Sequence, residues 1–123
     1  REGEADYKIT RGQKYAARDI TVEGDYSNAA FLDGFNLIDG DVFVTGLDEK
    51  SIQGDRIYKK MYADLISGQR EFDLSDCPDL APVMFALSGV KGGAHFTGTA
   101  RLKIKESDRA EVMRQELSKF GIT

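Results

Sequence analysis

Apolar residues recur at helical spacing in four segments of the chain. The segments are residues 27–38, 54–67, 80–87 and 109–120. Spacings of three and four residues place apolar side chains on one face of a helix, so each segment is expected to pack that face against the rest of the fold. Residues 80–87 are apolar on nearly every side, which predicts a central, buried helix.

Residues that commonly cap helices precede three of these segments. Asp25 or Ser27 is expected to cap the first helix, and Asp79 stands directly before the third. Asp108 is followed three residues later by Glu111, an acidic form of the capping box, so the fourth helix is expected to begin after Asp108. Caps of this kind are common, and capping is therefore the simplest interpretation of all three positions.

Short segments rich in β-branched and aromatic residues lie between the helices and predict strands. They are residues 7–10, 19–23, 41–45, 71–74 and an extended segment from about Ala94 to Ile104. From residue 20 onward, strand and helix alternate, which is typical of an α/β (α+β) fold with parallel strand pairs.

The two halves of the chain superpose as an internal repeat. Gly54-Asp55-Arg56 matches Ser107-Asp108-Arg109, 53 residues further on, and Gly40 matches Gly93 at the same offset. We therefore expect residues 1–123 to be a single piece of one domain containing two repeats, about 20–68 and 71–121.

Composition narrows the possible functions. A formal net charge of −4 argues against general nucleic-acid binding, and no apolar run is long enough to cross a membrane. One cysteine and one histidine cannot assemble a usual zinc site, so no metal or other cofactor is expected. A single cysteine and no visible signal peptide fit a reducing compartment, and a cytoplasmic location is expected.

The densest chemistry lies between Ala100 and Arg109. Lys105, Glu106 and Arg109 crowd the corner before the fourth helix, where the helix N-terminus presents unpaired N–H groups and a positive dipole end. Such a corner suits a small anion with an ionisable group beside it. An ordinary solvated turn of charged residues is the alternative that spacing alone leaves open.

The residues of this corner are similar to a family signature. Lys105-Glu106-Ser107-Asp108-Arg109 resembles the Lys-Glu-(Ser/Thr)-Asp-Arg motif of the 5-enolpyruvylshikimate-3-phosphate synthases. Three further stretches resemble the same family in the same order, and together the four cover most of the chain: residues 22–31, 44–47 with 53–55, and 78–82.

The resemblance implies a fold and a reaction. The family fold is assembled from repeated βαβαββ units with helices inside and sheets outside. Its enzymes transfer the enolpyruvyl group of phosphoenolpyruvate to the 5-hydroxyl of shikimate 3-phosphate and release phosphate, a step of chorismate and aromatic amino acid biosynthesis. Both substrates carry phosphate and carboxylate groups, so the reaction needs cations, a base for the hydroxyl proton and an acid for the methylene carbon.

The resemblance also implies roles for five residues. Asp79 matches the aspartate that touches the shikimate hydroxyls and is the favoured base, and Lys105 matches a lysine that contacts the shikimate phosphate and the reacting centre. Glu106 matches a glutamate assigned to proton transfer, and Arg109 an arginine that binds phosphoenolpyruvate. Arg101 stands where some members carry an asparagine that binds shikimate, which leaves its role open.

The family active site lies between two domains, and the motifs that the opposite domain supplies are not among these residues. The chain is therefore expected to be part of such an enzyme, lacking the remainder and inactive alone. Two alternatives stay open: a non-enzymatic anion-binding module built from a duplicated βαβ unit, and a fragment of the related enolpyruvyl transferase acting on a UDP-sugar.

Overall fold

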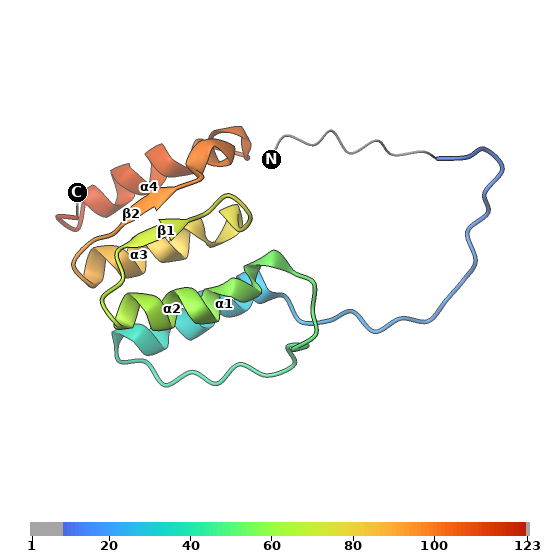
Figure 1. Ribbon diagram of the computed structural model, residues 1–123, viewed down its shortest axis with the longest axis horizontal. Helices are drawn as coiled ribbons and strands as arrows, with labels where there is room; N and C mark the ends of the chain where they lie inside the picture. Colours follow the sequence, from blue (N-terminus) through green and yellow to red (C-terminus); the bar gives the residue numbers. More distant parts are fainter. Residues whose placement is uncertain (1–8, 123) are drawn as a thin grey trace.

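The computed structural model describes residues 9–122 and shows a mixed fold of helices and a small parallel sheet (Figure 1). The α-helices are α1 (Tyr26–Gly34), α2 (Tyr58–Ile66), α3 (Ala81–Val90) and α4 (Arg109–Ser118). Short 3₁₀ helices are η1 (Phe35–Ile38), η2 (Gly54–Ile57), η3 (Pro78–Leu80) and η4 (Thr99–Ile104). The strands are β1 (Glu71–Asp73) and β2 (His95–Thr97).

The four predicted helices are all present, and two of the predicted caps are confirmed. The Asp25 side chain accepts hydrogen bonds from the backbone N–H groups of Ser27 and Asn28 at the start of α1. The Asp108 side chain accepts from the backbone N–H of Glu111 at the start of α4. These carboxylates satisfy N–H groups that have no partner inside the helix.

The predicted strands are only partly present. Residues 71–74 and the start of the segment at Ala94 form β1 and β2, which pair in parallel with Phe72 opposite Phe96. The extended segment does not continue to Ile104, because Gly98 adopts a positive φ of 69° and the chain then turns into η4. Arg101 and Lys103 are therefore in a 3₁₀ helix rather than a strand.

The strands predicted earlier in the chain are absent from the described residues. Residues 19–23 and 41–45 are extended but pair with no neighbour, and residues 9–23 reach away from the helices (Figure 1). Tyr7 and Lys8, part of another predicted strand, lie outside the described residues; Ile9 and Thr10 are not in a strand. A strand needs a hydrogen-bonding partner, whatever its composition.

The core is a single cluster to which α1, α2 and α3 contribute buried apolar side chains, whereas α4 contributes no fully buried residue. Helix α3 is central as predicted: none of its residues before Val90 is exposed. Phe96 of β2 stacks on Phe72 of β1 and meets Phe85 of α3 edge to face, so the sheet is fastened to the helix by aromatic contacts. Leu102 seals η4 onto the same cluster and is completely buried. No helix within residues 9–122 has the length and apolar character needed to cross a membrane.

Replacing Asp108 with alanine is expected to lower the free energy of unfolding by about 1 kcal/mol, because the backbone N–H of Glu111 loses its acceptor. Urea unfolding followed by circular dichroism would measure the change. Glu116→Ala is the control, since Glu116 makes only an exposed ion pair with Lys119 in the last turn of α4. Equal effects of the two substitutions would contradict a capping role for Asp108.

Candidate functional site

An open cleft of about 580 Å³ lies where the start of α1, the turn η3 and the connection into α4 meet. Its charged lining consists of Asp25, Asp79, Lys105, Glu106 and Arg109. Ser27 and Ser107 add hydroxyl groups, and the apolar lining is formed by Phe31, Pro82, Val112 and Met113. Residues far apart in the sequence therefore share one concave surface, which is the usual form of a small-molecule site.

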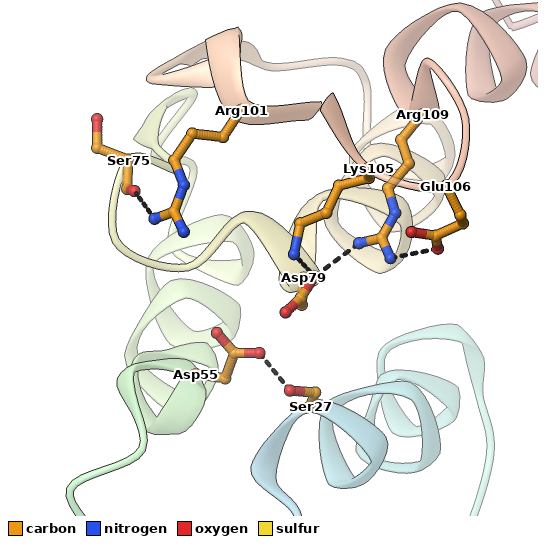
Figure 2. A network of polar contacts seen from close by, with 8 residues as sticks. All are labelled: Ser27, Asp55, Ser75, Asp79, Arg101, Lys105, Glu106 and Arg109. Carbon is orange, nitrogen blue, oxygen red and sulfur yellow. Dashed lines mark hydrogen bonds and ion pairs between the residues drawn. The ribbon is translucent and has the colours of Figure 1, made fainter. Parts of the chain in front are cut away.

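Four of the five predicted site residues form one ion-pair cluster on this surface, shown in Figure 2. Asp79 Oδ1 lies 3.0 Å from Lys105 Nζ and 2.7 Å from Arg109 Nη1. The other terminal nitrogen of Arg109, Nη2, donates to Glu106 Oε1 at 2.6 Å. The guanidinium therefore bridges two carboxylates. We call Asp79, Lys105, Glu106 and Arg109 the cation–carboxylate cluster.

The simplest interpretation of Asp79, as a helix cap, is wrong. Asp79 is inside η3, and the N-cap positions of η3 and α3 are Cys77 and Leu80, neither of which makes a side-chain cap hydrogen bond. The Asp79 carboxylate is instead turned toward the cations of the α4 corner. Pro78 and Pro82 each lack an N–H, which lowers the number of donors that a cap would serve.

The cluster fixes the protonation of its carboxylates. Hydrogen bonds from Lys105 and then Arg109 hold the pKa of Asp79 below its ordinary value, although partial burial opposes them. The hydrogen bond from Arg109 likewise lowers the pKa of Glu106. Both carboxylates are therefore ionised at neutral pH, and the two cations are already neutralised by two anions.

The accessible surfaces of these side chains differ. The side chains of Lys105 and Arg109 are 27% and 21% exposed, whereas that of Glu106 is 71% exposed. Glu106 is thus the partner that an incoming anion displaces with least loss of packing. Exposed ion pairs contribute little to stability, so this exchange costs the fold little.

Arg101 does not join the cluster. It is in η4 and exposed, and its Nη1 donates to the Ser75 carbonyl at 3.4 Å (Figure 2). Arg101 is not among the residues that line the cleft.

Two polar residues that line the cleft, and a third that contacts one of them, were not predicted as site residues. Asp25 and Ser27 line it, and Asp55 accepts a hydrogen bond from the Ser27 hydroxyl (Figure 2). The sequence favoured caps for the first two, and Asp55 stood only as the repeat counterpart of Asp108. Asp25 caps α1 and also lines the cleft. The sequence pattern of a helix cap does not reveal the second role. Within residues 9–122, no three His, Cys, Asp or Glu side chains gather closely enough to hold a metal ion.

Comparison with known proteins agrees with the motifs. The sequence profile described as EPSP synthase (3-phosphoshikimate 1-carboxyvinyltransferase) matches residues 1–123. The chain belongs to the EPSP synthase family. Its relatives named 3-phosphoshikimate 1-carboxyvinyltransferase include one from Clostridium kluyveri, 35% identical over 94% of this chain and 31% of the relative. Another, from Methanoculleus marisnigri, is 34% identical over 98% of this chain and 33% of the relative.

The chain spans about a third of the length of the curated EPSP synthase relatives it matches. A relative from Clostridioides difficile, 33% identical over 94% of this chain, is covered over only 30% of its own length. No solved structure gives a significant match.

Replacing Glu106 with glutamine is expected to tighten the binding of inorganic phosphate about twofold to threefold. The change removes one negative charge that competes with phosphate for Arg109, at an exposed position where solvent keeps such an interaction weak. Titration calorimetry at low ionic strength would measure it, and added salt should shrink the difference. Glu116→Gln, at the far end of α4, is the control and should change nothing; a Glu106→Gln protein that binds phosphate more weakly would contradict competition.

Proposed function

We propose that the chain is part of a 3-phosphoshikimate 1-carboxyvinyltransferase, which moves the carboxyvinyl group of phosphoenolpyruvate to the 5-hydroxyl of shikimate 3-phosphate. The observation that carries the proposal is the convergence of Asp79, Lys105, Glu106 and Arg109 on one open cleft. This cleft offers two cations for anionic groups and two carboxylates for proton transfer, as the reaction requires. A cytoplasmic location is part of the proposal and fits the single cysteine, Cys77.

Each member of the cation–carboxylate cluster has a proposed role. Lys105 binds the phosphate of shikimate 3-phosphate, and Arg109 binds phosphoenolpyruvate with its planar fork of donors. Asp79 accepts a hydrogen bond from a shikimate hydroxyl and takes its proton. Glu106 transfers a proton near the methylene carbon of phosphoenolpyruvate. Arg101 remains a candidate shikimate ligand that would have to leave Ser75 to reach the cleft.

Substrate binding is expected to change the basicity of the two carboxylates. Lys105 and Arg109 lower the pKa of Asp79, and Arg109 lowers that of Glu106. When phosphate and carboxylate groups of the substrates take over the two cations, both pKa values rise toward their ordinary range. Asp79 then becomes a better base, and Glu106 becomes able to carry the proton that the methylene carbon receives.

The proposal includes the repeated βαβαββ architecture with helices inside. Helix α1 and η1 leave large apolar side chains partly exposed, among them Phe31, Phe35 and Ile38. Phe43, in a segment expected to be a strand, is almost fully exposed. Further units of the same fold would cover these side chains and supply partners for the unpaired segments, which supports the proposed architecture.

Turnover is not expected from the chain by itself. The chain spans only about a third of its relatives, and the family site uses cations from an opposite domain. An assay for phosphate release from phosphoenolpyruvate with shikimate 3-phosphate would test this. Turnover by the isolated chain would overturn the expected dependence on the remainder.

Binding of shikimate 3-phosphate tests the proposed site itself. Backbone amide shifts of the labelled chain should move at Lys105 and Arg109, and the affinity should exceed that for inorganic phosphate. Asp79→Asn separates the proposal from a plain anion-binding module. It removes a competing charge and so strengthens phosphate binding, but it weakens shikimate 3-phosphate relative to phosphate because a hydroxyl loses its carboxylate acceptor. Equal effects on both ligands favour the anion-binding module.

A further inference from the structure

We infer that a pocket between α3, β2 and α4 is a second small-molecule site, and that it binds a compact, uncharged aromatic alcohol through the hydroxyl of Ser88. The pocket has a volume of about 340 Å³, within the usual range for small-molecule sites. Of the described residues, only Met113 lines both this pocket and the cleft. The inference uses no member of the cation–carboxylate cluster and is independent of the proposed function. We call this site the α4 pocket.

Helix α4 is held at both ends, and the α4 pocket lies between them. At its first residue, Arg109 Nη1 lies 2.7 Å from Asp79 Oδ1 in η3. Just beyond its last turn, Ile122 packs so closely on Gly89 of α3 that a Cβ atom on Gly89 would lie 2.7 Å from Ile122 Cγ2. Between these contacts, no residue of α4 is fully buried. The pocket is therefore a formed space under a fixed helix.

The lining of the α4 pocket suits an aromatic ring without a charge. Phe85 and Phe96 both line it, with their ring centroids 4.8 Å apart and the rings edge to face, and Met113 contributes a thioether. Aromatic rings pack favourably on other rings and on thioether sulfur. Arg114 is the one ionisable side chain among the described lining residues, and Glu111 already pairs with it at 2.7 Å. A charged ligand would therefore find no free counter-charge inside the pocket.

Ser88 supplies the polar group of the α4 pocket. It is 2% exposed and lines the pocket, and its Oγ has no hydrogen-bond partner within residues 9–122. An unpaired buried hydroxyl destabilises the fold, whereas alanine would occupy the same helical position without that cost and with a higher helix propensity. Such an atom indicates a partner that the polypeptide does not provide.

A phenol-like molecule matches both properties of the pocket. Its ring would pack against the aromatic lining, and its hydroxyl would pair with that of Ser88. The serine hydroxyl both donates and accepts, and it has three staggered positions about the Cα–Cβ bond from which to meet the ligand. A buried water molecule is the alternative partner for Ser88 Oγ, and the experiment separates the two.

The test compares phenol with toluene, which has a similar shape but no hydroxyl. Each is titrated into the labelled 123-residue chain, and the affinities are taken from backbone amide shifts. The shifts should centre on residues that line the α4 pocket, such as Ser88, Ala110 and Leu117. Ser88→Ala should weaken phenol binding about threefold to tenfold, the usual effect of one neutral hydrogen bond, and should change toluene binding by less than about twofold.

Two further variants locate the effect. Ser118→Ala is the matched control, because Ser118 is an exposed serine of α4 that does not line the pocket and whose hydroxyl donates to the Gln115 carbonyl at 2.7 Å. It should leave both affinities unchanged. Ala94→Leu adds a larger side chain to the lining and should weaken both probes. Ser88→Ala removes an unpaired oxygen from a helix and should keep the urea midpoint of the chain, so its result does not depend on a folding defect.

Three results would overturn the inference. Failure of both probes to bind would show that the pocket is not a ligand site. Equal effects of Ser88→Ala on phenol and toluene would leave water as the partner of Ser88. Shifts confined to the exposed apolar side chains of α1 and η1, such as Phe35 and Ile38, would place the probes outside the pocket. Each of these results leaves the proposed function standing, because that function is tested with phosphate and shikimate 3-phosphate.

Discussion

Replacing Arg109 with glutamine is expected to weaken the binding of inorganic phosphate to the chain tenfold to a hundredfold. Arg109 is the less exposed of the two cluster cations and presents two nitrogens, each of which already holds a carboxylate oxygen at 2.6 or 2.7 Å. Hydrogen bonds to charged groups are worth about 1.5–3 kcal/mol, and 1.4 kcal/mol is a factor of ten in affinity. Titration calorimetry or amide shifts would measure the loss.

Matched variants separate the contribution that the planar pair of donors of Arg109 makes to phosphate affinity from the contribution of its charge. Arg109→Lys keeps the charge but not the planar pair of donors, and an intermediate loss is expected. Arg114→Gln is the control, because Arg114 also pairs with a glutamate on α4 but does not line the cleft. Unchanged phosphate affinity in Arg109→Gln would remove the basis for an anion site at this corner.

Replacing Leu102 with alanine is expected to lower the free energy of unfolding by about 2–5 kcal/mol, the usual cost of emptying a buried leucine site. Leu102 is fully buried and is the residue through which η4 joins the core. Because whole domains are stable by only about 5–15 kcal/mol, the loss takes a large part of the total. Urea unfolding followed by circular dichroism would measure it.

The same 3₁₀ helix provides a control for Leu102. Ile104 is 79% exposed, so Ile104→Ala removes a similar side chain that contributes little burial. It should change the unfolding free energy by less than about 0.5 kcal/mol. Similar losses for both variants would mean that η4 is not held by Leu102.

Local signals in the sequence predicted the helices well. The apolar periodicity and the Asp108–Glu111 spacing located α4, and both depend only on residues within one or two turns. The strands depend on distant partners, and the prediction was correspondingly less successful. Residues 41–45 have strand composition, but no neighbouring strand is present among the described residues to pair with them.

The candidate site was likewise predicted only in part, because some of its contacts join residues that are distant in the sequence. Family motifs pointed to the residues of the cation–carboxylate cluster, whereas spacing alone favoured a solvated turn. Local sequence could not show that Asp79 does not cap the third helix. An aspartate before an apolar helix has the pattern of a cap whether or not it serves as one. Ser27 and Asp55 were missed because their contact joins residues 28 positions apart and has no local signature.

Arg109 links helix α4 to the turn η3 as well as lining the cleft. Arg109 is the first residue of α4, and its ion pair with Asp79 joins the beginning of that helix to the turn η3. An anion that binds the guanidinium of Arg109 would weaken its ion pair with Asp79. The link between α4 and η3 would then pass through the bound anion. We therefore expect an anion that fills the cleft to affect the first turn of α4, because it competes for a side chain that also contacts η3.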